Sequence, residues 1–195
     1  MHGLINLALQ RFATDTYGRD LWDGIAHAAG LGFSDFEPMM LYEPEVTEAV
    51  VDALARRLGR DRAALLEDVG TYLVSHPNSA PVRRLLRFCG AGFEDFLQSL
   101  DELPDRARLA VPELDLPRLE LRVHGPTRCA LVCDGAIPGA GHVLVGVLRA
   151  MADDYGALVT LEHMGTRQGR ERIGIALVMA GYSEGRRFDL GARTG

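Results

Sequence analysis

The sequence predicts an α+β fold, in which a helical N-terminal part precedes an antiparallel four-stranded sheet accompanied by helices. Three observations lead to this prediction. Apolar residues recur at helical spacing through the first half of the chain, and after residue 117 they alternate with charged residues as strands do. A further apolar segment of helical period, residues 138–155, separates the first two predicted strands from the last two.

Helices dominate the first half. Gly18 ends the first one, Pro44 stands at a typical first helical position, Gly59 is a stop signal, and Asp61 suits the N-cap of the helix that follows it. The predicted elements are helices over residues 4–16, 19–29, 44–58, 63–75 and 81–89, with a loop over residues 32–42.

The second half changes from helical period to period two. Pro104 should end or kink the helix that begins at residue 93, because proline lacks an N–H and its ring clashes with the preceding turn. The predicted elements are a helix over 93–103 that resumes over 106–109, a hairpin of strands 119–123 and 129–133, a helix over 138–155, and strands 157–163 and 172–179 joined by a polar turn at 165–171.

The chain contains no linker rich in Pro, Ser or Gly, so we expect one domain. We place it at residues 1–182, with a helical subdomain over 1–60 and an α+β subdomain over 61–182 that pack directly on each other. Residues 183–195 carry little apolar content and predict a mobile tail.

Composition indicates a soluble protein that does not bind nucleic acid. The 195 residues are 47% hydrophobic and 25% charged, and the net charge is −6. All 21 basic residues are arginine, which is typical of a GC-rich bacterial genome rather than of a basic interface. No window approaches the ~18 apolar residues of a membrane span, and the N-terminus does not resemble a signal peptide. Cys89, Cys129 and Cys133 form no Cys-x-x-Cys pair, so a reducing cytoplasm is the expected location.

Two segments carry a resemblance to a known family. Residues 97–109 read LQSLDELPDRARL, with Pro112 and Pro117 after them, and residues 1–6 read MHGLIN. Together they resemble the heme-nitric oxide/oxygen-binding domain family (H-NOX, or HNOB), whose matching helix reads Leu-Asp-x-Leu-His and bonds the heme iron through that His. Pro104 stands at the ligand position, and a proline has no lone pair to give a metal.

The register of this match rests on a second proline. The family places a proline thirteen residues after the ligand, where it presses on the porphyrin, and Pro117 lies thirteen residues after Pro104. The same register puts Cys133, Gly135 and Ile137 at the family's Tyr-x-Ser-x-Arg motif, and none of the three can replace those propionate donors. An alternative alignment on residues 124–128 keeps an Arg at the right internal spacing but falls in the predicted hairpin turn.

The resemblance implies a ligand cavity between the two subdomains. The slot would be formed by residues 97–103 and 143–151, and we expect Ile5, Leu100 and Leu144 among the side chains that contact a bound group. His142 would lie on the helix that faces the distal side, where it could ligate iron from the opposite face. The alternative is that His142 caps its helix or lies at the surface.

The other cysteines and histidines give weaker signals. Cys129 and Cys133 share one face of a strand, which allows a thiolate ligand but is more typical of small apolar residues on the inner face of a sheet. His76 would offset a helix dipole, and His2, His27 and His163 have no partner by spacing.

Nothing in the sequence indicates an enzyme. The chain lacks a Gly-x-Ser-x-Gly elbow and a His-Glu-x-x-His helix, and the Gly-rich residues 135–142 lack the Lys-Ser/Thr that a phosphate loop needs.

The resemblance implies a sensory or regulatory domain of bacterial signalling. We expect it to hold no cofactor, or heme bound weakly by an altered mode, and to act on a partner such as a histidine kinase or diguanylate cyclase. A small apolar ligand is a further expectation. The alternatives are a gas sensor that uses a substitute ligand such as His142, and a ligand-free scaffold whose cavity is filled by Leu100, Leu148 and Met151.

Overall fold

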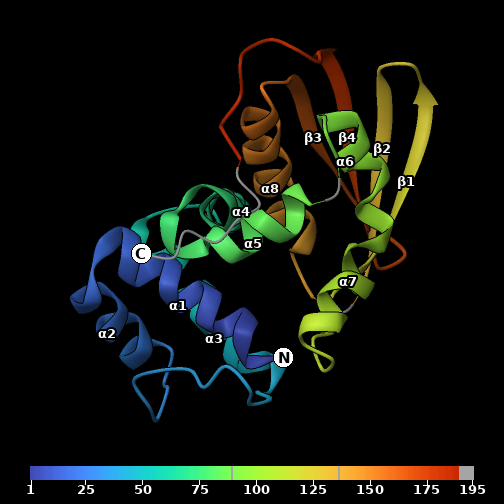
Figure 1. Cartoon of the computed structure of the whole chain (residues 1–195). Helices are drawn as coiled ribbons and strands as arrows, with labels where there is room; N and C mark the ends of the chain where they lie inside the picture. Colours follow the sequence, from blue (N-terminus) through green and yellow to red (C-terminus); the bar gives the residue numbers. More distant parts are fainter. Residues whose placement is uncertain (89, 136, 189–195) are drawn as a thin grey trace.

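The computed structural model of the chain describes residues 1–88, 90–135 and 137–188. Figure 1 shows a helical part built around α1, α2 and α3 on one side, the antiparallel sheet on the other, and α4, α5 and α8 between them. The helices and strands are α1 Gly3–Tyr17, α2 Arg19–Ala28, α3 Pro44–Leu58, α4 Arg62–Ser75, α5 Ala80–Arg87, α6 Phe93–Gln98, α7 Leu103–Ala110, β1 Arg118–Gly125, β2 Arg128–Asp134, α8 Ala140–Tyr155, β3 Leu158–Arg167 and β4 Arg170–Met179, with short 3-10 turns at Pro77–Ser79 and Leu100–Glu102.

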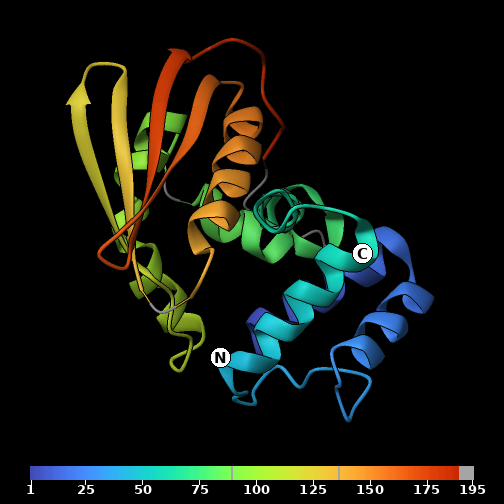
Figure 2. The same ribbon diagram turned by 180° about the vertical axis from the view of Figure 1, so that it is seen from behind.

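The four strands form one antiparallel sheet in the order β1-β2-β4-β3. The predicted α+β class is therefore confirmed. α8 packs against β3 and β4, and the view from behind shows the same arrangement (Figure 2). The helix thus lies between α4 and the sheet.

Local sequence signals explain most helix ends. The Asp61 carboxylate accepts hydrogen bonds from the backbone N–H groups of Ala63 and Ala64, as an N-cap does, and Pro44 is the first residue of α3. Gly59 adopts the left-handed conformation that ends α3. These capping devices are visible in the sequence because they act within a few residues.

Pro104 divides the helix that the sequence predicted over residues 93–103. α6 ends at Gln98, a 3-10 turn follows, and α7 begins at Leu103 with Pro104 in its first turn. A proline is tolerated there because the first N–H groups of a helix have no intrahelical acceptor.

The β3–β4 connection is tighter than the polar turn predicted over residues 165–171. The strands continue to Arg167 and from Arg170, so Gln168 and Gly169 alone make the turn. Both have positive φ values, 55° and 75°, as the favoured two-residue hairpin turn requires. The sequence signal was weak because Gln is an unusual residue at the first of these positions.

Two apolar clusters stabilise the fold. One joins the N-terminal helices to α4 around Trp22, Ile25, Leu54 and Leu65, and the other joins α6, α7, α8 and the sheet. Val143 of α8 contacts both clusters. Because α4 also contributes to both, the division of the domain at residue 60 remains our proposal.

The first residues of the predicted tail pack on the body of the protein. The backbone N–H groups of Ser183 and Arg186 donate to the carbonyls of Gly156 and Asp154, and Arg83 donates to the carbonyl of Arg187. Residues 189–195 of that tail lie outside the described residues, as does Cys89. Within the described part of the chain, no helix is long and apolar enough to span a membrane.

Candidate functional site

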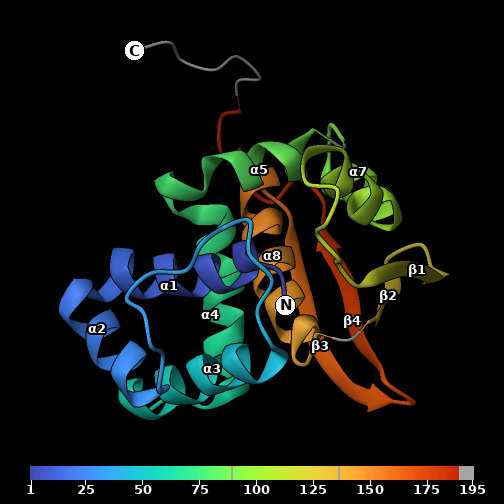
Figure 3. The same cartoon turned by 90° about the horizontal axis from the view of Figure 1, so that it is seen from below.

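A cavity of about 440 Å³ lies between the N-terminal helices and the α+β part. Its size is typical of small-molecule sites. In Figure 3, α1 and α4 lie on one side of α8 and the sheet lies on the other. The wall is mainly apolar and includes Leu4, Ala8, Val51, Leu66, Val69, Leu85, Ala107, Leu116, Leu119, Val143 and Val147.

Five residues that the sequence singled out lie in this wall. They are Ile5 of α1, Pro104 of α7, Pro117 just before β1, Ile137 before α8, and Leu144 of α8. They come from segments far apart in the chain, and the packing of the two parts on each other brings them together.

Four other candidates lie elsewhere. Leu100 is buried in the apolar cluster that joins α6, α7, α8 and the sheet, which we call the sheet-side cluster. Cys133 of β2 belongs to the same cluster, and neither residue lines the cavity. Gly135 packs on Pro117, because a Cβ there would lie 2.9 Å from the Pro117 Cα. His142 is also absent from the wall and instead stacks on His163, with 3.9 Å between ring centroids.

The position of His142 corrects the expectation that it faces the pocket. Successive helical residues are about 100° apart around the axis, so Val143, Leu144 and Val147 share one face of α8 while His142 precedes them on another. The geometry therefore gives no support to His142 as a ligand from the distal side.

The donor set of the wall does not fit a histidine-ligated heme. Among the described residues, the wall contains no His and no Cys. Tyr72 lines the cavity, but its hydroxyl donates a 2.6 Å hydrogen bond to the Asp15 carboxylate. Burial, together with that bond, raises the pKa of Tyr72 to about 12, so the phenolate form that binds iron is disfavoured. Met1 adds only a thioether.

The positions expected to anchor propionates are also unsuitable. Burial, reinforced by the nearby Glu171 and Asp134 carboxylates, raises the pKa of the Cys133 thiol to about 12. Gly135 has no side chain, and Ile137 presents an alkyl group to the cavity. These residues supply neither the hydroxyls nor the cation of the family's motif.

Two polar residues of the wall, Thr47 and Asn78, donate hydrogen bonds to residues outside it. Buried Thr47 donates to the side-chain oxygen of Asn6, at 2.6 Å, and Asn78 donates to Asp15 at 3.0 Å. Arg11 of α1 both lines the cavity and is exposed to solvent, so this residue lies at the edge of the cavity. Arg11 and Tyr72 could not be predicted as wall residues, because a lone Arg or Tyr on an amphipathic helix carries no distinguishing pattern.

Close packing of α4 on α8 sets the position of the α8 wall. A Cβ on Gly70 would lie 2.0 Å from the Val143 carbonyl oxygen, and one on Gly146 would lie 2.0 Å from the Glu67 carbonyl oxygen. Each glycine therefore lets the backbone of one helix contact the other directly. This contact positions Val143, Leu144 and Val147 against the cavity.

Comparison with known proteins relates this chain to one family. The family model described as HNOB, Haem-NO-binding, matches residues 2–163. Soluble guanylate cyclase 89Da of Drosophila melanogaster is 21% identical over 155 residues, and gcy-35 of Caenorhabditis elegans is 25% identical over 162. These matches cover 80% and 78% of this chain but only 23% and 22% of the relatives.

A solved structure shows the same fold. A triple mutant of an H-NOX protein from S. oneidensis in the Fe(II) ligation state superposes with a TM-score of 0.77 at 17% identity, over 92% of this chain and 97% of that one. At this identity the likeness shows the fold alone.

Proposed function

The chain belongs to the Haem-NO-binding family, and on that premise we propose that it is a sensory domain whose cavity takes a ligand without the iron–histidine bond. The domain itself is not catalytic. We further propose that it carries no resident heme, or binds heme weakly by an altered mode, and that it acts in the cytoplasm of a bacterium.

The observation that carries this proposal is the placement of Pro104 in the cavity wall. The family resemblance assigns the iron ligand to this position, and a proline there offers the cavity only ring carbons. Pro117 lines the same wall at the expected separation, which supports the register. The lack of His and Cys among the described wall residues supports the same conclusion.

The open cavity favours a ligand-binding domain over a ligand-free scaffold. Leu100, Leu148 and Met151, which we expected to fill the space in a scaffold, are buried in the sheet-side cluster and do not line the cavity. The cavity is large enough for a small molecule, and its apolar wall favours one that is mostly apolar. Arg11 would favour a ligand with a polar or anionic end toward solvent.

The proposed output is a change in contact with a signalling partner. The curated relatives named above are guanylate cyclases in which the matched region is under a quarter of the chain. By analogy we propose a cyclase or a histidine kinase as the partner. α1 and α8 both line the cavity, so a ligand that fills it can alter how the helical part sits on the sheet part.

The test is an absorption spectrum of the full chain, expressed with ample heme and then titrated with hemin. We expect no sharp Soret band at one heme per chain. A sharp stoichiometric band would overturn the proposal, because it would require an axial donor that the wall does not supply.

A second measurement tests the cavity itself. Binding of an environment-sensitive apolar dye should weaken in Leu144→Phe, whose larger side chain reduces the volume. Leu109→Phe is the matched control, because Leu109 is 87% exposed on α7. Equal dye binding by both variants would argue that the cavity is not the site.

A further inference from the structure

Three metal-ligating side chains from three different elements meet beside the first turn of α8. They are His142 of α8, His163 of β3 and Glu171 of β4, and one ligand atom from each lies within 4.8 Å of the other two. The His163 Nε2 lies 2.9 Å from the Glu171 Oε2. The His142 ring stacks on the His163 ring at an interplanar angle of 20°.

The β3–β4 pairing brings His163 and Glu171 together. His163 pairs with Ile173, and the register then shifts so that Thr166 pairs with Glu171. Glu171 lies two residues before Ile173 and therefore on the same face of β4, which makes it a diagonal neighbour of His163 across the two strands, although eight positions separate them in the chain. Both side chains are almost nine-tenths buried, with 13% and 12% of their surfaces exposed.

A glycine allows α8 to complete the cluster. A Cβ on Gly141 would lie 2.6 Å from the Glu171 Oε2 and 2.8 Å from the His163 Nε2. A side chain at this position would displace the histidine–carboxylate pair, so Gly141 lets the start of α8 approach that pair in its present geometry. The next residue, His142, then covers the His163 ring.

A carboxylate on α4 lies near the His142 ring. The Glu67 Oε1 lies 3.6 Å from the His142 Nδ1, and the Glu67 Oε2 accepts a 2.8 Å hydrogen bond from Arg149. The His142 Nδ1 is buried and, among the described residues, no hydrogen bond satisfies it. A proton on Nδ1 directed toward Glu67 would leave Nε2 free to ligate, which is how carboxylates commonly position metal-binding histidines.

We propose that His142, His163 and Glu171 bind a divalent transition-metal ion of the Zn²⁺ class, with water as the fourth ligand. Two imidazoles and a carboxylate are a donor set that zinc uses, and imidazole favours such ions over Mg²⁺. In a tetrahedral site, bonds of about 2.1 Å place ligand atoms about 3.4 Å apart. The present cluster must therefore contract, and the stacked rings must tilt so that their lone pairs converge.

This site is separate from the cavity, and the inference does not depend on the proposed function. His142 and the cavity residues Val143 and Leu144 nevertheless share one turn of α8. A bound ion would tie that turn to the β3–β4 hairpin, and would thereby fix the end of α8 that lines the cavity.

The test is a calorimetric titration of the full chain, first dialysed against a chelator, with Zn²⁺ and separately with Mg²⁺. We expect one Zn²⁺ per chain and no comparable Mg²⁺ binding. His163→Ala and His142→Ala should each weaken Zn²⁺ binding at least tenfold, and Glu67→Gln should weaken it about tenfold through the orientation of His142. His124→Ala, at an exposed position on β1, is the matched control and should bind as the unmodified chain does.

Glu171→Gln keeps the inference testable if a histidine variant fails to fold, because it preserves the shape of the side chain. We expect Glu171→Gln to weaken Zn²⁺ binding. When Co²⁺ is used in place of Zn²⁺, this variant should lack the absorption bands of a tetrahedral Co²⁺ site. Failure to bind Zn²⁺, or equal binding by Glu171→Gln and the unmodified chain, would overturn the site and would show that these residues form only a hydrogen-bonded cluster.

Discussion

Pro104 and Pro117, thirteen positions apart in the chain, lie in the wall of the same cavity. Pro104 lies in the first turn of α7 and Pro117 directly precedes β1, so two different elements place prolines in the same wall. This relationship agrees with our proposal that residue 104 stands where the family places its proximal ligand, and it makes residue 104 the most informative position to change.

Pro104→His should restore part of the missing donor set. We expect hemin to give a Soret band with this variant, at less than one heme per chain, because Cys133, Gly135 and Ile137 still offer no propionate anchors. The change should not disrupt α7, since residue 104 lies in its first turn. Pro112→His, at an exposed position outside the cavity wall, is the control and should give no band. Tight stoichiometric heme binding by Pro104→His would show that the anchors are not limiting.

The glycines between α4 and α8 should be intolerant of a methyl group. Gly70→Ala and Gly146→Ala each place a Cβ about 2.0 Å from a backbone carbonyl oxygen, so the helices must move apart. We expect each to lower the free energy of unfolding by about 1–3 kcal/mol in urea denaturation. Gly24→Ala is the control: it lies in α2 with open space around it and should stabilise the protein by about 0.5–1 kcal/mol. Destabilisation by all three variants alike would contradict the packing argument.

We expect substitution of Asp154 to lower the stability of the protein more than substitution of most other charged residues. Its carboxylate is fully buried, 2.8 Å from Arg83 and 3.5 Å from Arg87. Asp154→Ala leaves these guanidinium groups without their counter-ion, which we expect to cost about 3 kcal/mol of stability in urea unfolding. Asp153→Ala, the exposed neighbour on the same helix, should have little effect. A similar loss in both variants would show that the cost comes from α8 itself and not from the buried pair.

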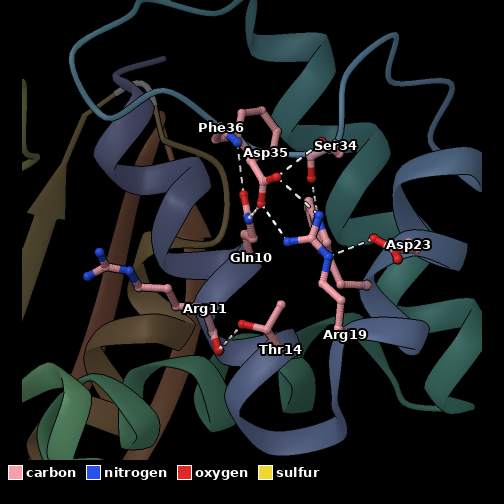
Figure 4. Close-up of polar contacts among 9 residues, drawn as sticks. Gln10, Arg11, Thr14, Arg19, Asp23, Ser34, Asp35 and Phe36 are labelled. Atoms are coloured by element: carbon pink, nitrogen blue, oxygen red, sulfur yellow. Dashed lines mark hydrogen bonds and ion pairs between the residues drawn. The ribbon is translucent and has the colours of Figure 1, made fainter.

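Acid should weaken the contact that holds the loop before α3. Figure 4 shows Asp35 between Gln10 and Arg19, and the Arg19 Nη1 donates to it at 2.7 Å. The hydrogen bond from Arg19 outweighs the opposing effect of burial and lowers the pKa of Asp35 from 3.8 to about 2. Because the folded-state pKa is the lower one, the stabilisation is present above pH 4 and is lost as the pH falls toward 2.

We therefore expect Asp35→Asn to lower the thermal midpoint at pH 7 and to reduce its dependence on pH between 4 and 2. Asp15 acts in the same direction: although burial alone would raise its pKa, hydrogen bonds from Tyr72 and Asn78 lower it, so some acid dependence should remain. Asp115→Asn, at an exposed position, is the control. An unchanged acid profile in Asp35→Asn would contradict the assignment.

Local signals allowed most of the fold to be predicted. Capping at Asp61, the stop at Gly59 and the alternation after Pro117 act within a few residues, so the sequence displays them directly. The β3–β4 turn was predicted too long because Gln168 has a positive φ, and Gln is not a residue type that indicates this conformation. The resemblance supplied the family and the register of Pro104.

The sequence by itself determined the order of the helices and strands, because residue type and spacing along the chain indicate them. It also supports the proposal that residue 104 is a proline at the position where the family resemblance expects the iron ligand. The tertiary structure alone decided that an open cavity remains, since a void is what side chains from both halves of the chain leave unfilled. It also decided that His142 turns away from that cavity toward His163 and Glu171. That meeting depends on the pairing of β3 with β4 and on the close approach of Gly141 to that hairpin, and no local pattern encodes either of them.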